Sequence, residues 1–489
     1  MFGTAEESIH VIAERLDEEY ATPLPTCSTS TEPFANEFAS KSTLKSTPAA
    51  VSSSSHLSTS SGSFCPCSAS NNLDDLATKA IGAVSIRTLQ GPAHAWHSHS
   101  HRVVIDCYPW VSVLEPLMNN AQRDSPLHMS TLMLARAYLV NRRMLQASKV
   151  EENRIRGICL ASVRSALANP TMATKDATIM AVWLLGTYEV LQGSIKWPPD
   201  KANSWGIHQT GLVSLITARG IDQFKTAQGR QIFWLCVESV QIYHNATSQP
   251  CSASLLAWLH RLKRWKLSKA ENLVLAGAFL SARVSELYPH MREVVFSNSP
   301  EFAAAAIPAL VAETNSIEQE YAAWAELALD PDLLAQARSQ YKLPVCRMKL
   351  HNFLVYCINL GLQAGNFSQS LPEAELRSQR HQSMMLIQDI AEQLLETAPP
   401  TAITRSNEQA LGHEWTKKMA MMYPFASICH MQTPRLEQRV RAREVLKFIG
   451  RECGILQALR PSMGTQMPER ASRGMPDVKL VGEEGIPLT

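Results

Sequence analysis

Apolar residues recur at helical spacing from about residue 103 to residue 460, and this constrains the fold more than any other feature. In SPLHMSTLMLARAYLVNRRMLQA, for example, Leu127, Leu134 and Tyr138 fall on one face of a helix. Strand signals are weak over the same range, because no series of alternating runs occurs and no Asn-Gly or Asp-Gly pair marks a hairpin turn. The sequence therefore predicts an all-α fold, an irregular multi-helix body without a fixed repeat.

Several helix ends carry recognisable start or stop signals. Ser125 precedes a proline and is expected to cap one helix, while Ser268 and Glu271 have the spacing of a capping box. A further helix is expected to begin with Thr174 as its cap and to end at Gly193, where glycine favours a left-handed conformation.

Changes in composition divide the chain into four parts. Residues 1–21 predict a short acidic amphipathic helix, and residues 22–102 a disordered linker that contains Ser, Thr and His but few large apolar side chains. Residues 103–460 form the helical body, and residues 461–489 a flexible polar tail. Most functional information must therefore lie in the third part.

Charge and cysteine content narrow the class of protein. A net charge of +2 over 489 residues predicts no extended nucleic-acid surface, so direct DNA binding is doubtful. The 11 cysteines follow no regular spacing, which favours a reducing interior over a secreted disulfide framework. No apolar run reaches the roughly 18 residues of a membrane span, so we expect a soluble intracellular protein without a membrane partner.

One histidine-rich tract, AHAWHSHSHR, is the clearest candidate for metal chemistry. It contains four imidazoles that are suitable zinc ligands: His94, His97, His99 and His101. Their spacing is not that of a helical metal pair, and they precede the helical body, so we expect an irregular polar loop and no metal site. Phosphate-binding and nucleophile motifs are also missing, so neither a cofactor nor catalytic residues are predicted.

Two basic stretches are expected to be solvated helix ends rather than binding surfaces. The first is RLKRWK at residues 261–266. The second is RVRAREVLKFIGR, in which Val440, Val445 and Phe448 are expected to face the core while the arginines face water.

The segment SWGIHQTGLVSLITARG places Trp205, His208 and Arg219 on one helical stripe with leucines. Gly211 beside this stripe would let a neighbouring helix approach closely, and Gly220 is expected to cap the helix in a left-handed conformation. A buried charge on such a stripe needs a partner. We therefore hypothesise that Glu189, in the preceding helix, hydrogen-bonds His208 or Arg219.

The order of these segments resembles the regulatory domain of fungal-specific transcription factors of the binuclear zinc-cluster class. The matching residues are Tyr188-Glu189, Trp205, His208, Gly211-Leu212, Arg219-Gly220 and Gly229-Arg230. MYPFA at 422–426 and ECGILQAL at 452–459 are similar to the closing helices of that family. The resemblance covers about residues 103–460 and identifies six structural signature positions: Glu189, Trp205, His208, Gly211, Arg219 and Gly220.

This resemblance implies an all-α domain without enzymatic residues, in a nuclear protein that regulates fungal metabolic genes, plausibly a secondary-metabolite cluster. The zinc-cluster DNA-binding module is not intact, because no C-x2-C spacing occurs among Cys27, Cys65, Cys67 and Cys107. We therefore expect the chain to act through a protein partner, either a DNA-bound factor or the transcription machinery, unless the module was lost from the gene model.

Two other functions remain open at this stage. The chain could be a helical scaffold or interaction protein outside the nucleus, or a metal-dependent helical enzyme that uses the histidine tract. Grooves between helices would suit a small effector or a partner helix, and the sequence does not distinguish them.

Overall fold

The structure, a computed structural model, describes residues 93–108, 111–146, 148–195, 204–330, 342–365, 372–398, 411–460 and 467–475. All regular elements in these ranges are α-helices or short 3₁₀ helices, and no strand occurs among them, so the predicted all-α fold is confirmed. The helix expected within residues 1–21 lies outside the described residues, as do most of the linker and most of the tail.

The first group of helices leads from the start of the described chain to the middle. It comprises α3 (Ala93–Cys107), α4 (Leu114–Asn119), α5 (Pro126–Asn141), α6 (Lys149–Leu167), α7 (Pro170–Ala173), α8 (Asp176–Gln192), α9 (Ser204–Arg219), η1 (Ile221–Phe224), α10 (Ala227–Thr247) and α11 (Ala253–Leu262).

The second group completes the body. It comprises α12 (Lys269–Phe296), α13 (Pro300–Leu327), α15 (Lys342–Gly361), α16 (Glu373–Glu396), α17 (Leu411–His430), α18 (Leu436–Glu452), η3 (Leu456–Leu459) and α19 (Glu469–Ser472).

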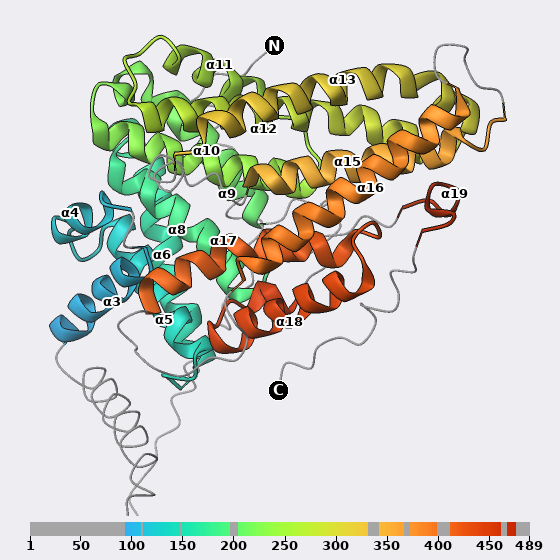
Figure 1. Cartoon of the computed structure of the whole chain (residues 1–489). Helices are drawn as coiled ribbons and strands as arrows, with labels where there is room; N and C mark the ends of the chain where they lie inside the picture. Colours follow the sequence, from blue (N-terminus) through green and yellow to red (C-terminus); the bar gives the residue numbers. More distant parts are fainter. Residues whose placement is uncertain are drawn as a thin grey trace, which may run out of the picture.

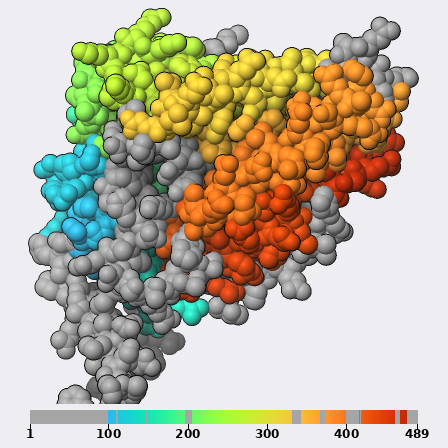
Figure 2. Space-filling model, in the orientation of Figure 1, coloured from blue at the N-terminus to red at the C-terminus, as the bar shows by residue number. Residues whose placement is uncertain are grey.

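Two hydrophobic cores organise these helices (Figure 1). The larger core joins α3–α11 to the closing helices α16–α18, and α17 packs directly on α3. The smaller core lies between the long helices α12, α13 and α15, which pack on one another in pairs. In the space-filling view the yellow and orange segments form one continuous surface, so the three-helix layer packs directly against its neighbours (Figure 2).

Local capping explains why several helices begin and end where they do. The Ser125 hydroxyl accepts from the His128 amide, and Ser268 and Glu271 form the predicted capping box. Gly193 ends α8 in the left-handed conformation, also as predicted. The expected cap at Thr174 is wrong: α8 begins one residue later, after Lys175, which makes no side-chain cap.

The helical body starts earlier than the sequence indicated. Residues 93–102, expected to be irregular, belong to α3, which packs against α5 and α17. Tertiary packing of this kind stabilises a helix even where its intrinsic propensity is poor. Within the described residues, no helix is both long enough and apolar enough to cross a bilayer.

The basic helix α18 is only partly as predicted. Val445 is buried and Phe448 packs against the larger core, but Val440 is 47% exposed. Arg439 is 0% exposed although it was expected to face water. The helix is therefore rotated so that Arg439, rather than Val440, points inward.

Candidate functional site

The signature residues lie where α8 and α9 pack closely. Trp205 and His208 are buried on α9, and Gly186 of α8 faces them. A Cβ atom at Gly186 would lie 3.2 Å from Nε2 of Gln209 and 3.6 Å from Cβ of His208. The glycine therefore permits the two helices to approach each other, while Gly211 is buried on α9.

The predicted hydrogen bond between Glu189 and His208 is not formed. Glu189 Oε1 lies 3.9 Å from His208 Nε2, with both side chains buried, which is longer than a hydrogen bond. The Glu189 carboxylate instead accepts from the Ser194 hydroxyl, and His208 Nε2 has no hydrogen-bond partner among the residues that the structure describes. The two groups face each other as predicted but would attract strongly only with a protonated imidazole.

Arg219 pairs with Asp176 and not with Glu189. Gln228 Nε2 donates to the same Asp176 carboxylate over 2.5 Å. Asp176 starts α8, Arg219 ends α9 and Gln228 lies in the first turn of α10. An acidic residue at a helix start and a basic residue at a helix end each complement the helix dipole. Through its contacts with Arg219 and Gln228, the Asp176 carboxylate connects three helix termini.

Gly220 has the positive φ that was predicted, at 77°, but its ψ of −164° is extended rather than left-handed helical. It precedes the 3₁₀ helix η1 instead of closing α9 with a left-handed cap. No atom lies within 4 Å of a Cβ built there, so backbone conformation alone favours glycine at this position.

The closing motif ECGILQAL meets the end of α8. The Ile195 amide donates to Gln457 Oε1 over 3.1 Å, and Arg460 donates to the Gly193 carbonyl over 2.7 Å. A Cβ atom at Gly193 would lie 3.0 Å from the backbone of Leu456. Two of the segments on which the family resemblance depends are therefore direct neighbours.

The histidine tract lies on a helix, α3, rather than in a loop. His101 Nε2 lies 3.0 Å from Nδ1 of the buried His128, while the side chains of His94 and His97 lie outside the described residues. Among the side chains that are described, no three His, Cys, Asp or Glu residues come together as a metal site would require.

A Ser–His–Glu array that the sequence did not indicate occurs between α13, α15 and α16. His351 Nδ1 lies 3.0 Å from the Ser383 hydroxyl, and its Nε2 lies 3.1 Å from Glu318 Oε1. Arg347 also donates to Glu318, over 2.9 Å. Burial by itself would raise the pKa of Glu318, but these hydrogen bonds from His351 and Arg347 lower that pKa to about 2.

This array is closed to any substrate. Ser383 is 1% exposed and His351 4% exposed. The hollow beside Glu318 and Arg347 measures about 10 Å³, which is room for one water at most. The residue types match a hydrolase triad. Their burial, however, favours a structural role, in which hydrogen bonds hold three helices together.

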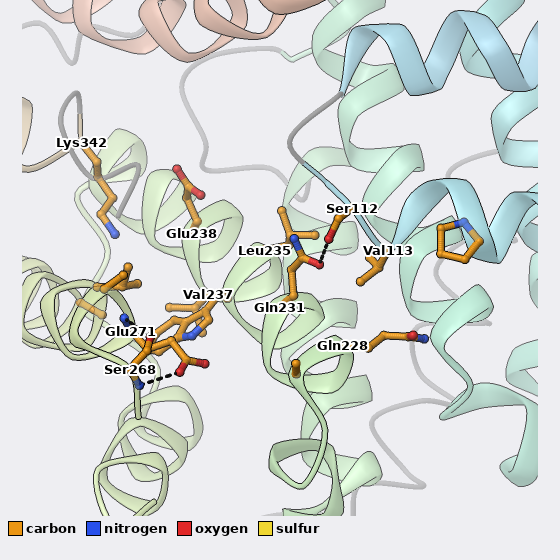
Figure 3. Close-up of a pocket in the computed structure, with 16 residues that line it drawn as sticks. Ser112, Val113, Gln228, Gln231, Leu235, Val237, Glu238, Ser268, Glu271 and Lys342 are labelled. Atoms are coloured by element: carbon orange, nitrogen blue, oxygen red, sulfur yellow. Dashed lines mark hydrogen bonds between the residues drawn. The ribbon is translucent and has the colours of Figure 1, made fainter. Parts of the chain in front are cut away.

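A candidate binding site in the described part of the chain is a cleft of about 500 Å³ between α10 and the start of α12 (Figure 3). The loop before α4 closes one side with Ser112 and Val113, and Lys342, the first residue of α15, enters from the other. Its volume is within the range of small-molecule sites. The segments that form it are separated by long stretches of sequence, so no local motif could have predicted it.

The polar groups of the cleft differ in how well they are satisfied. Glu271 accepts from the Ser268 amide over 2.9 Å and from Arg230 over 2.7 Å. Ser112 donates to Gln231 over 2.9 Å. These groups are therefore engaged by the protein itself.

Lys342 is the exception among the charged groups of the cleft. Its ammonium group donates to Gln241 Oε1 over 2.7 Å, and the residue is only 8% exposed. Burial lowers its pKa, and the nearby charge of Glu238 partly opposes this effect. A buried cation at the wall of a cleft is a physical indication of a functional site.

Comparisons of this chain with family models, with curated proteins and with solved structures return no match.

Proposed function

We propose that this chain is a nuclear regulator of transcription that acts through a protein partner and whose helical body responds to a small effector. The main support is the ordered set of sequence motifs that resembles a fungal transcription factor regulatory domain. The contact between the end of α8 and the closing motif, through Gly193, Ile195 and Gln457, is consistent with these motifs acting as one unit.

Indirect action on DNA agrees with the charges that the chain carries. The net charge is +2, and the basic side chains of residues 261–266, a stretch that begins in the last turn of α11, are exposed. The Arg261 guanidinium lies 4.4 Å from the centre of the Trp258 ring. A short solvated strip of this kind would neutralise few phosphates. The regulated genes would then be selected by the partner, with metabolic genes the expected targets.

A non-catalytic role agrees with the chemistry of the described residues. The Ser383–His351–Glu318 array is enclosed, and burial raises the pKa of the described cysteine thiols whose shift is resolved, such as Cys236. A raised pKa leaves a thiol protonated and unreactive. The cleft at Lys342, by contrast, is accessible and is where an effector would act.

A tethering experiment tests the proposal. The full chain, fused to a heterologous DNA-binding module, is expected to change transcription of a reporter several-fold in either direction, and a tagged chain is expected to accumulate in the nucleus. Unchanged reporter transcription together with exclusion from the nucleus would contradict the proposal and favour a scaffold elsewhere in the cell.

Two matched variants connect that readout to the fold. Gly186→Val is expected to abolish the reporter effect, because the side chain would collide with α9. Gly157→Val introduces the same substitution on α6, where nothing lies within 4 Å of the new Cβ, and should preserve the effect. Circular dichroism of both purified variants shows whether the helical content is kept.

A further inference from the structure

The described residues satisfy the Lys342 ammonium group only in part. It carries three N–H donors, but its one hydrogen bond goes to a neutral amide, that of Gln241. No carboxylate in the described part of the chain lies within ion-pair distance of it. Since a buried charge is costly unless it is paired, this position is unfavourable for a protein without a ligand.

The carboxylates that line the same cleft do not form an ion pair with Lys342. Glu271 is used by Ser268 and Arg230 at the start of α12. Glu238 and Lys342 form no ion pair, and the charge of Glu238 acts on the ammonium group from farther away. An incoming anion could therefore reach Lys342 without first breaking an ion pair inside the protein.

The rest of the lining is suited to an apolar body. Val113, Leu235 and Val274 contribute aliphatic side chains, and Trp234 contributes an aromatic wall. The buried indole N–H of Trp234 meets no acceptor among the described residues, so the wall has no such hydrogen bond to lose when a ligand packs beside it. A hollow of about 500 Å³ holds a small molecule but not a folded partner.

We propose that the cleft between α10 and α12 binds a small organic acid, with its carboxylate on Lys342 Nζ and its apolar body against Val113 and Val274. This assignment rests on the proposed function, because it names the class of effector to which the helical body would respond. Binding would give this partly compensated buried cation a hydrogen-bonded ion pair, which is a strong interaction in a site shielded from water.

A series of three compounds that differ only in the head group tests the proposal by calorimetry on the purified full chain. Phenylbutyrate is expected to bind, phenylbutyramide to bind at least about tenfold more weakly, and phenylbutylamine to bind more weakly still. Equal affinity for the acid and the amide, a preference for the amine, or the absence of binding by the acid would each overturn the proposal.

Three variants identify the residue that is responsible. Lys342→Met keeps the apolar stem and is expected to remove the preference for the acid over the amide. Glu238→Gln removes a nearby negative charge and is expected to strengthen binding of the acid. Lys266→Met, an exposed lysine outside the cleft, is the control and should leave the preference unchanged.

The outcomes remain informative if one variant fails to fold, because the three compounds are compared on the unmodified chain. An acid preference that survives in a folded Lys342→Met chain would overturn the assignment. Binding of the acid without any reporter effect would contradict the proposed function alone. A reporter effect without acid binding would contradict the ligand assignment alone.

Discussion

Helix α15 places nitrogen-bearing side chains in two different surroundings. Lys342, at the start of the helix, has one hydrogen bond to a neutral amide and faces a cleft. Arg347 and His351, further along, share the Glu318 carboxylate, and His351 also contacts Ser383. The difference shows how a buried polar group that stabilises the fold can be distinguished from one that is available to a ligand.

The deciding property is whether the protein completes the hydrogen bonds and charges of the group. The Glu318 carboxylate accepts its hydrogen bonds from Arg347 and His351 of the same chain. The neighbouring hollow has room for no more than one water molecule. At Lys342 the ammonium group donates to one neutral amide and forms no ion pair with a described residue, beside a hollow of about 500 Å³. Burial alone therefore does not indicate function, whereas an unbalanced charge beside a cavity does.

The largest expected change in the free energy of unfolding is at Glu318, whose hydrogen bonds are supplied by the protein. Glu318→Ala should destabilise the protein by about 3 kcal/mol, because it leaves the buried His351 and the half-buried Arg347 without their shared acceptor. Glu320→Ala on the same helix, α13, removes a more exposed partner of Arg283 and should cost less than about 1 kcal/mol. Urea unfolding of both variants measures the contrast, and equal losses would break the comparison.

The same carboxylate makes stability depend on pH. The pKa of Glu318 in the folded protein, about 2, is below its ordinary value of 4.5, so the folded state binds this proton less tightly than the unfolded state. Its contribution to the free energy of unfolding is complete above about pH 4.5 and is lost as the pH falls toward about 2. Unfolding measured across that window should show a steeper loss for the unmodified chain than for Glu318→Gln.

A gain in the free energy of unfolding, rather than a loss, is expected for a substitution of Lys342. Lys342→Met should raise the free energy of unfolding by about 1 kcal/mol, because it replaces a buried charge that forms no ion pair with a described residue by an apolar side chain of similar length. Lys349→Met is the matched control on α15, since Lys349 donates to the Asn245 and Ala246 carbonyls at the end of α10. That control should lose about 1 kcal/mol. Destabilisation by both substitutions would remove the distinction between the two sites.

The smallest effect is expected at the signature pair of α8 and α9. Glu189→Gln should change the free energy of unfolding by about 0.5 kcal/mol or less near neutral pH, because no hydrogen bond joins Glu189 to His208 and the amide oxygen can still accept from Ser194. A loss of unfolding free energy comparable to that of Glu318→Ala would show that Glu189 and His208 interact more strongly than their separation of 3.9 Å suggests.

Local signals predicted the local structure well. Helical periodicity predicted the all-α fold, and the Ser268–Glu271 capping box and the left-handed Gly193 were confirmed because each depends on a few consecutive residues. This reasoning fails in two places. One cap lies at Lys175 instead of Thr174, and Arg439 points inward instead of toward water. How a helix is rotated about its axis is decided by its neighbours.

The partners of buried polar groups could not be predicted in the same way. Placing Glu189 beside His208 was correct to the level of the helix face, but the hydrogen bond depends on differences below 1 Å that no sequence pattern encodes. Arg219 forms an ion pair with Asp176 instead, at the other end of α8 from Glu189. Lys342 carries no local signal at all, because the cleft exists only once α4, α10, α12 and α15 have packed together.

The most direct test compares the unfolding free energies of the unmodified chain and of Lys342→Met, each with and without phenylbutyrate. We expect the variant to be the more stable chain without the acid, and the acid to stabilise only the unmodified chain, since a ligand stabilises the state that binds it. A variant that is less stable without the acid, or an acid that stabilises both chains equally, would contradict the claim that Lys342 is held in place for a ligand.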